Sequence, residues 1–307
     1  MEHRGESPRT SVEVITGSYT GPEGTRAWRL AVPAGGGNNR PVIVMLHGCL
    51  QDAADLARGS QFDAAAERFG ALVLYPEQPI SANPRKCWNW FDEAHQQRGR
   101  GEPALLAALV NEVVAKHQGD PSRVHLVGIS AGAAMATLLT VAYPEQFASL
   151  TSIAGIGWRA APNVGRALAV MQQGAGDMLP GGAALIAAMG ERARAVPVLV
   201  VHGVADNVVS VRNARETVQQ FVQLHDQLAA AHGGTALRDI VLAEATEHGY
   251  RVQETQWRDA TGAAQVTLLT VEQLGHAFPF GASAGTFTDA NGPDLLARVG
   301  ARLARRP

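Results

Sequence analysis

The chain has 307 residues, enough to bury a substantial core without a disulfide framework or a structural metal. Its 28 acidic and 26 basic residues leave a formal net charge of −2, and no long charge run occurs, which argues against a nucleic-acid-binding or membrane-surface protein. No apolar run approaches the roughly 18 residues needed to cross a bilayer.

The first ten residues, 1–10, are polar and contain Pro8, which predicts a flexible tail. They lack the apolar stretch of a signal peptide, so we expect a cytoplasmic location as the chain stands. A secreted or periplasmic location is expected if a leader has been removed. Residues 11–307 are expected to form a single catalytic domain, because no Pro/Ser linker and no fixed-period repeat divides them.

Apolar, β-rich segments then alternate with helical ones. Three nearly continuous apolar runs, VIVML, VHLVG and VPVLVV, are typical of strands covered on both faces. Strands are predicted at residues 11–19, 25–32, 41–47, 71–75, 123–128, 149–153, 196–202, 250–258 and 265–273. Helices are predicted at residues 62–69, 103–117, 131–143 and 211–231. The alternation predicts an α/β fold with a doubly wound, mostly parallel sheet and an antiparallel N-terminal edge. The Gly- and Ala-rich residues 155–194 are expected to form a small cap over the carboxyl ends of the strands.

One serine lies where a nucleophile is expected. Gly128-Ile129-Ser130-Ala131-Gly132 matches G-x-S-x-G, follows the strand VHLVG and opens a predicted helix. This strand–turn–helix setting holds a serine in a strained conformation with its Oγ exposed. A second match, around Ser283, lies in a Pro/Gly-rich loop with no strand before it and is expected to be a surface turn. Ser130 is therefore the predicted nucleophile.

The base and the acid are expected to follow in the order acid, then histidine. His276 follows the last apolar strand and is the predicted base, its alternative being a structural loop histidine. Asp206 follows the strand PVLVV and is the predicted partner of the imidazole, its alternative being to cap the next helix. His225 and His232 fall in or beside a polar helix and are expected to be exposed to solvent.

The oxyanion hole needs two backbone N–H groups, one of which usually comes from the residue after the serine. Ala131 fits that place. The loop His47-Gly48-Cys49 follows the strand VIVML, and Gly48 would allow a close approach, so the second donor is assigned to the Cys49 N–H.

Nothing in the sequence has the spacing of a metal or phosphate site, because neither H-E-x-x-H nor G-x-x-x-x-G-K occurs. No cofactor and no metal are therefore expected. His47 and His202 each precede a glycine at a strand end, where local hydrogen bonding is the expected role.

Several longer segments now point to a family. HGCLQ, NPRKCWNWFDEAHQQRGRGEPALLAALV, GISAG and HGVADNVVSVRN occur in that order and are followed by LGHAFPFG and TFTDANGPD. Together, over residues 17–294, they resemble the polyhydroxybutyrate-depolymerase family of esterases, α/β-hydrolases related to feruloyl and acetylxylan esterases. The resemblance implies an α/β-hydrolase fold and a Ser130, Asp206 and His276 triad, in agreement with the choice made from the residues.

The resemblance implies a cofactor-free serine esterase acting on short-chain hydroxyalkanoate esters, on oligomers or on amorphous polyester. Because the chain has no threonine-rich linker or polymer-binding domain, crystalline polymer is expected to be a poorer substrate. An aryl or carbohydrate esterase of the feruloyl or acetylxylan type is the first alternative. A non-catalytic binding protein on the same fold is the second.

Two features of the pocket also follow from the resemblance. Cys49 and Cys87 both lie inside resembling motifs, so a disulfide between them is hypothesised, the alternative being two buried thiols. Trp88 and Trp90 are both candidates for the pocket wall or for the core, and Trp88 is chosen as the substrate contact. Phe278 is the second predicted contact, because Phe278-Pro279-Phe280-Gly281 replaces the Trp-Ser-Gly-Gly-like stretch of relatives and should make the rim more apolar.

Overall fold

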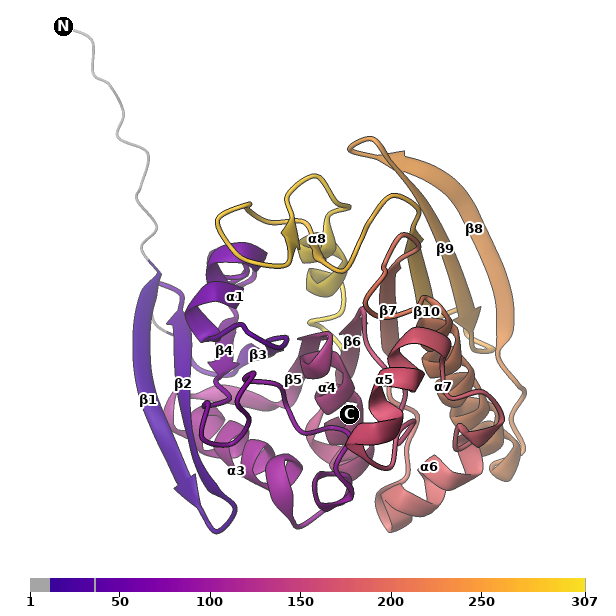
Figure 1. Ribbon diagram of the computed structural model, residues 1–307, viewed down its shortest axis with the longest axis horizontal. Coiled ribbons are helices and arrows are strands. Elements are labelled where there is room, and N and C mark those ends of the chain that lie inside the picture. The colour runs from indigo at the N-terminus through magenta and orange to yellow at the C-terminus, as the bar shows by residue number, and fades with distance from the viewer. Residues whose placement is uncertain (1–11, 36, 307) are drawn as a thin grey trace, which may run out of the picture.

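The structure, a computed structural model, describes residues 12–35 and 37–306, so the predicted tail at residues 1–10 lies outside it. Its centre is a ten-stranded sheet with the order β1-β2-β4-β3-β5-β6-β7-β10-β9-β8 (Figure 1). The strands are β1 (Glu13–Gly21), β2 (Gly24–Val32), β3 (Arg40–Leu46), β4 (Leu72–Pro76), β5 (Gly119–Ile129), β6 (Ser149–Ile153), β7 (Val198–Gly203), β8 (Arg238–Glu247), β9 (Tyr250–Arg258) and β10 (Ala264–Val271). The six strands from β4 to β10 in that order pair in parallel.

Helices cover both faces of this sheet. They are α1 (Ala53–Ser60), α2 (Asp63–Phe69), α3 (Gly101–Lys116), α4 (Ala131–Ala142), α5 (Val164–Gln173), α6 (Gly182–Met189), α7 (Arg212–Ala231) and α8 (Leu295–Gly300). One apolar core cluster joins the sheet to α3 through α7, and the other joins it to α1, α2 and α8. All twelve residues of α4 are buried, which explains why its sequence AGAAMATLLTVA is apolar on every side.

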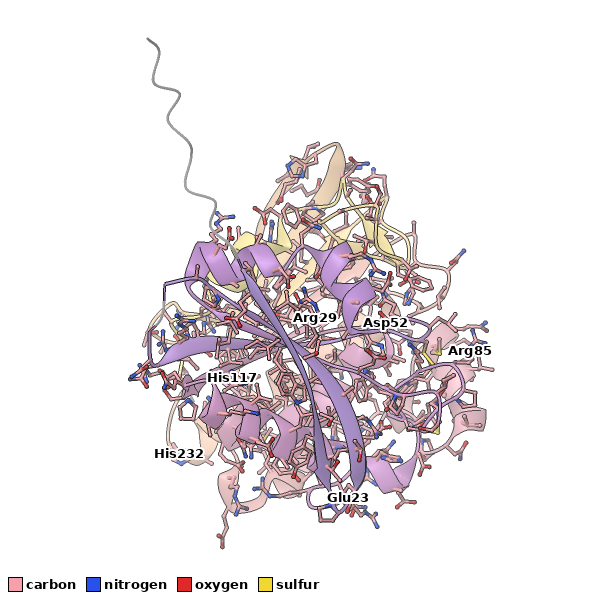
Figure 2. The ribbon with its side chains drawn as sticks, turned by 90° about the vertical axis from the view of Figure 1, so that its left-hand side faces the viewer. Glu23, Arg29, Asp52, Arg85, His117 and His232 are labelled. Carbon is pink, nitrogen blue, oxygen red and sulfur yellow. A yellow bond between two sulfur atoms is a disulfide. The ribbon has the colours of Figure 1, made fainter. Side chains whose placement is uncertain are left out.

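The predicted α/β architecture is confirmed, including the antiparallel N-terminal edge. β1 pairs antiparallel with β2, and β2 pairs antiparallel with β4. Figure 2 views the molecule from this edge, with both strands crossing in front. Every strand expected from the sequence is present, with ends shifted by no more than four residues apart from Ser11, which lies outside the described residues.

The hairpin at the opposite edge was not predicted. β8 and β9 form an antiparallel hairpin, which pairs through β9 with β10. The hairpin turns at His248 and Gly249, whose φ angles of 48° and 89° are those of a two-residue turn with both central residues left-handed. Because the usual signal for that turn is Asn-Gly or Asp-Gly, the His-Gly pair did not reveal it. At this edge β9 was predicted as a strand, whereas β8 and its pairing with β9 were not.

Four further helices were not predicted from the sequence: α1, α5, α6 and α8. None of them is longer than ten residues. Helix α1 begins at a capping residue, since the Asp52 carboxylate accepts from the Asp55 N–H at 2.9 Å. Helices α5 and α6 fall within residues 155–194, the segment expected to form a cap. Within the described ranges, no helix is both long and apolar enough to cross a membrane.

Candidate active site

Ser130 occupies the sharp turn between β5 and α4. Its φ of 56° and ψ of −121° lie in a region that non-glycine residues rarely adopt, so the residue is held there by its surroundings. Two glycines make the turn possible: a Cβ on Gly128 would strike the Gly132 backbone, and one on Gly132 would strike the carbonyl groups of Leu46 and His47. The turn thus brings β5, the start of α4 and the end of β3 into backbone contact.

The structure brings Ser130, His276 and Asp206 together from three separate loops. The Ser130 Oγ lies 3.0 Å from His276 Nε2, and His276 Nδ1 lies 2.7 Å from Asp206 Oδ2. The Asp206 side chain is fully buried and that of His276 is 8% exposed. A hydroxyl, an imidazole and a carboxylate in this order can transfer the hydroxyl proton to the ring while the carboxylate orients it.

The surroundings of Asp206 keep it ionised. Burial alone would raise the pKa of this carboxyl group, but hydrogen bonds from His202, His276 and the Val209 N–H outweigh it and hold the pKa well below its ordinary value. Its Oδ1 accepts from the N–H groups of Val208 and Val209, each at 2.8 Å. A permanently charged and fixed carboxylate is what stabilises a histidine cation.

Close backbone packing explains how the loops carrying Asp206 and His276 meet. A Cβ on Gly203 would overlap the carbonyl group of Leu274, so only glycine fits at the end of β7. The Val204 N–H donates to the Val271 carbonyl at 2.8 Å, and the Ala205 N–H donates to the Leu274 carbonyl at 3.1 Å. These bonds fix the two loops against each other just before each functional side chain.

The loop after β3 lies beside Ser130. A Cβ on Gly48 would lie 3.4 Å from the Ser130 Cβ, which is ordinary van der Waals contact. Among the hydrogen bonds of residues 12–35 and 37–306, none uses the N–H of Cys49 or of Ala131. The two N–H groups predicted as oxyanion donors thus have no acceptor in the described part of the chain.

A buried network holds this loop. Gln51 accepts from the Gly48 N–H at 3.0 Å and donates to Asp55 at 3.1 Å and to the Thr286 carbonyl at 2.9 Å. Asp55 in turn accepts from the Thr286 N–H and hydroxyl. Gln51 therefore ties the loop after β3 to the loop after His276.

His47 supports the same loop from inside the protein. The Gln78 N–H donates to His47 Nε2 at 3.0 Å, so Nδ1 carries the proton and donates to the Gly48 carbonyl at 2.8 Å. Burial lowers the pKa of His47 to about 4, which keeps this ring neutral. His202 likewise forms a local bond, donating from Nε2 to the Val209 carbonyl at 2.8 Å.

The hypothesised disulfide is confirmed. Cys49 and Cys87 are joined by an S–S bond of 2.06 Å and link the loop after β3 to the loop that contains the tryptophans. The Leu50 N–H also donates to the Arg85 carbonyl at 2.7 Å, so the two loops are connected by covalent and hydrogen bonds at neighbouring positions.

Ser130 and His276 open into a mainly apolar cavity of about 520 Å³. Its walls come from the loop after β3, the tryptophan loop, helix α5 and the loop after His276. The lining side chains include Leu50, Arg85, Trp90, Phe91, Val164, Leu168, Met171, Val208 and Phe287. Helix α5 contributes residues at the i, i+3, i+4 and i+7 positions of one face, a pattern that sequence inspection could have found.

Neither predicted substrate contact lines this cavity. Trp88 is fully buried, and its Nε1–H donates to the His47 carbonyl at 3.1 Å, so it packs beneath the loop after β3. Phe278 is 1% exposed and packs edge-to-face on Phe62 at 5.6 Å. Trp90 and Phe287 take the places in the cavity wall, with the Phe287 ring 6.2 Å from that of His276.

Of two other sequence expectations, one is confirmed, since Ser283 is exposed and lies in a turn, and one is wrong. The second G-x-S-x-G, around Ser283, packs against α1: the Ala282 N–H donates to the Gly59 carbonyl at 2.8 Å, and a Cβ on Gly285 would strike Gly59. His225, expected to be exposed, is 4% exposed and bonded to the Val196 carbonyl at 2.9 Å, so that expectation is wrong. Its helix, α7, is amphipathic, and His225 lies on the buried face.

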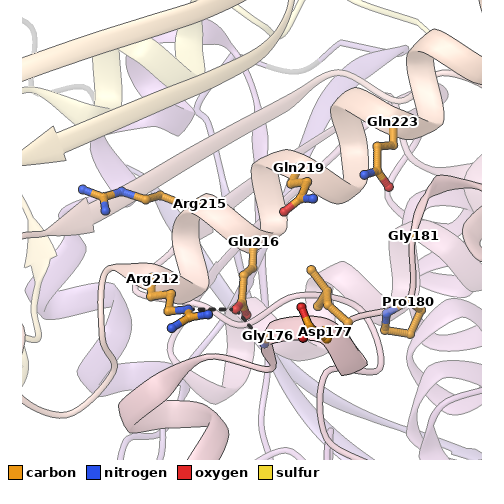
Figure 3. Close-up of a pocket in the computed structure, with 10 residues that line it drawn as sticks. Gly176, Asp177, Pro180, Gly181, Arg212, Arg215, Glu216, Gln219 and Gln223 are labelled. Atoms are coloured by element: carbon orange, nitrogen blue, oxygen red, sulfur yellow. Dashed lines mark hydrogen bonds and ion pairs between the residues drawn. The ribbon is translucent and has the colours of Figure 1, made fainter.

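A second cavity, of about 630 Å³, lies between α7 and the segment before α6 (Figure 3). Its lining is polar and contains Asp177, Arg212, Glu216, Gln219 and Gln223. The Glu216 carboxylate has a structural role, because it accepts hydrogen bonds from the N–H groups of Ala175 and Gly176. None of the residues around Ser130 lines this cavity.

Comparison with known proteins agrees with the geometry. The model of the family "Esterase PHB depolymerase" matches residues 27–242. Poly(3-hydroxyalkanoate) depolymerase C of Paucimonas lemoignei is 32% identical over 255 residues, which are 81% of this chain and 57% of that protein. Feruloyl esterase B of Neurospora crassa is 29% identical over 193 residues, 59% of this chain and 63% of that protein. The chain thus spans about three fifths of the length of these relatives.

Among solved structures, an acetyl xylan esterase from Aspergillus awamori superposes with a TM-score of 0.68. The match covers 85% of this chain and 94% of that one at 21% identity, which shows a shared fold. The family match extends over more than half of the chain and includes both the loop after β3 and Ser130. The chain belongs to the PHB depolymerase family of esterases, on an α/β-hydrolase fold.

Proposed function

We propose that this protein is a serine esterase that hydrolyses carboxylic esters through an acyl-enzyme. The observation that carries the proposal is the hydrogen-bonded chain from Ser130 through His276 to Asp206 at the floor of an apolar cavity. The family membership and the esterase names of the relatives support the same reaction. Residues 11–307 would form one catalytic domain around the ten-stranded sheet.

The first half of the reaction forms the acyl-enzyme. His276 Nε2 accepts the proton of the Ser130 hydroxyl as the Oγ attacks the ester carbonyl carbon, and Asp206 stabilises the imidazolium. The negative charge on the former carbonyl oxygen is met by the N–H groups of Cys49 and Ala131. The tetrahedral intermediate collapses, the bond to the alcohol oxygen breaks, and the alcohol leaves with the proton from His276.

The second half releases the acid. His276 takes a proton from a water molecule, which attacks the carbonyl carbon of the acyl-enzyme, and the same two N–H groups stabilise the second oxyanion. The bond to Ser130 Oγ then breaks, and the serine recovers its proton from His276.

The cavity favours substrates with short apolar acyl and alcohol parts. Leu50, Trp90, Leu168 and Phe287 would contact them in place of Trp88 and Phe278. Short-chain hydroxyalkanoate esters, their oligomers or amorphous polyester fit this description. Feruloyl or acetylxylan ester hydrolysis is the second candidate, favoured by the names of the other relatives.

The test is hydrolysis of a p-nitrophenyl ester series from acetate to octanoate by the wild type and by Ser130→Ala. Activity that decreases with acyl length and is lost in the variant supports the proposal. An inactive wild type favours a binding protein, and a variant as active as an active wild type contradicts the assignment of Ser130. Hydroxybutyrate oligomers, methyl ferulate and acetylated xylan then separate the substrate classes.

We also propose that the protein works in an oxidising compartment, secreted or periplasmic, rather than in the cytoplasm. The support is the Cys49–Cys87 disulfide, because such bonds persist outside the reducing cytosol. Titration of thiols in unfolded, unreduced protein isolated from its source tests this: no thiol supports it, and two contradict it.

A further inference from the structure

One charged side chain interrupts the apolar wall of the cavity. Of the lining residues in the described part of the chain, Arg85 alone carries a permanent charge, and the other polar side-chain groups belong to Gln51, Trp90, Ser130 and His276. Arg85 is exposed and lies at the outline of the molecule when it is viewed from the β1 edge (Figure 2). A cation at the mouth of an ester-binding cavity is available to a substrate that enters it.

The guanidinium group of Arg85 has no ion-pair or hydrogen-bond partner within residues 12–35 and 37–306. The neighbouring cation is different, since Lys86 pairs with Asp52 at 3.4 Å and with Glu77 at 3.6 Å. The charge of Lys86 is therefore neutralised by two carboxylates, whereas the adjacent charge of Arg85 lies unpaired beside the cavity.

The backbone of Arg85 is fixed although its side chain is free. Its N–H donates to Asn83 Oδ1 at 2.9 Å, and its carbonyl accepts from the Leu50 N–H at 2.7 Å. Cys87, two residues on, is covalently bound to Cys49. The backbone that carries the guanidinium group is thus fixed relative to the loop after β3, which would hold the oxyanion.

We propose that Arg85 binds a carboxylate carried by the ester substrate, so that the protein prefers esters with one free acid end. The planar guanidinium group matches a carboxylate with two parallel hydrogen bonds, and the pair would lie at the mouth of the cavity, where water still reaches it. A short hydroxyalkanoate oligomer has this chemistry, with its free carboxylate on the alcohol side of the last ester bond. A half-ester of a dicarboxylic acid has it on the acyl side. This inference rests on the proposed esterase function.

The experiment compares acid and amide forms of the same ester. The 3-hydroxybutyrate dimer and its primary carboxamide differ only in charge at the alcohol side, and monoethyl glutarate and its carboxamide differ only at the acyl side. Each compound is hydrolysed by wild type, Arg85→Gln, Arg85→Lys and the matched control Lys86→Gln, which removes a neighbouring charge outside the cavity lining.

In the wild type, kcat/KM should be about threefold to fivefold higher for the acid than for the amide in one of the two pairs, because a well-aligned charge pair at an exposed position supplies about that factor. The pair that shows the ratio identifies the side on which the carboxylate lies. Arg85→Gln should abolish the ratio mainly through KM, Arg85→Lys should keep part of it, and Lys86→Gln should leave it unchanged.

Equal ratios in wild type and Arg85→Gln, or an equal loss in Lys86→Gln, would overturn the inference. Activity on p-nitrophenyl butyrate, which is neutral, serves as a separate measurement. If every form hydrolyses it and no pair shows the ratio, the carboxylate site is wrong and the esterase function stands. If the wild type hydrolyses no ester at all, the proposed function fails first.

Discussion

Replacing Gln51 by Met tests whether its hydrogen bonds position the loop after β3, which would hold the oxyanion. The two side chains have similar length, but Met offers no amide to the Gly48 N–H, the Thr286 carbonyl or Asp55. Gln51 is 2% exposed, so water cannot readily replace those bonds. Thr286 and Asp55 keep their own contacts with each other.

The expected loss follows from the group left without a partner. The buried Gly48 N–H would lose its acceptor, at a cost of about 1–3 kcal/mol, whereas Thr286 is exposed and its carbonyl keeps the Thr288 hydroxyl as a donor. The free energy of unfolding should therefore fall by about 1–3 kcal/mol. Because Gly48 precedes the Cys49 donor, a displaced loop should also lower kcat by about 10- to 1,000-fold, up to the loss of one oxyanion donor.

The assay is kcat for p-nitrophenyl butyrate well below the melting temperature, together with urea unfolding. Gln219→Met, the same change at an exposed position of α7, is the control and should match the wild type in both. A Gln51→Met protein that loses stability but keeps its kcat within about twofold would refute the positioning role. Unchanged stability would refute the network itself.

Three further predictions concern the charge, the covalent link and the buried histidines. Asp206→Asn should lower kcat by about 10³–10⁴ while circular dichroism stays native, and a loss below tenfold would contradict its role in orienting the imidazole. Reducing the Cys49–Cys87 bond should lower the unfolding free energy by about 2–4 kcal/mol, and a melting temperature unaffected by reductant would contradict that. Burial lowers the pKa of His47 and His125 to about 4. Between pH 6.5 and 4, these two histidines therefore bind protons in the unfolded chain but stay neutral in the folded one. Stability measured by urea should fall across that window, by about 2 kcal/mol per histidine at pH 5, and His125→Gln should flatten the fall, whereas an equal slope would contradict the assignment.

Those parts of the fold whose burial is uniform could be predicted from the sequence. A run such as VIVML can only be a strand covered on both sides or a buried helix, and its length decides between them. Strand β9 was predicted with its observed bounds, but its partner β8 was not, because the turn between them is His248-Gly249 and lacks the usual hairpin signal. The antiparallel edge beyond β10 depends on strand pairing, which local periodicity does not encode.

The residues brought together around Ser130 could be predicted for a related reason. Carboxyl ends of parallel strands meet at one edge of the sheet, so Ser130 after β5, Asp206 after β7 and His276 after β10 had to converge there. The same rule placed Cys49 after β3. The rule does not predict which residues line the cavity beside Ser130, so the contributions of helix α5 and Phe287 were missed.

The choice between Trp88 and Trp90 shows where this reasoning stops and what the tryptophan loop does. The two residues are two positions apart in a segment without helix or strand, so no periodicity tells which ring faces the cavity. The indole N–H decides it: that of Trp88 finds an acceptor in the His47 carbonyl, directly before Gly48, and the ring is fully buried. Trp90 then lies on the cavity side. The CWNWF segment therefore supports the loop after β3 from below with Trp88, ties it covalently with Cys87 and supplies part of the cavity wall with Trp90.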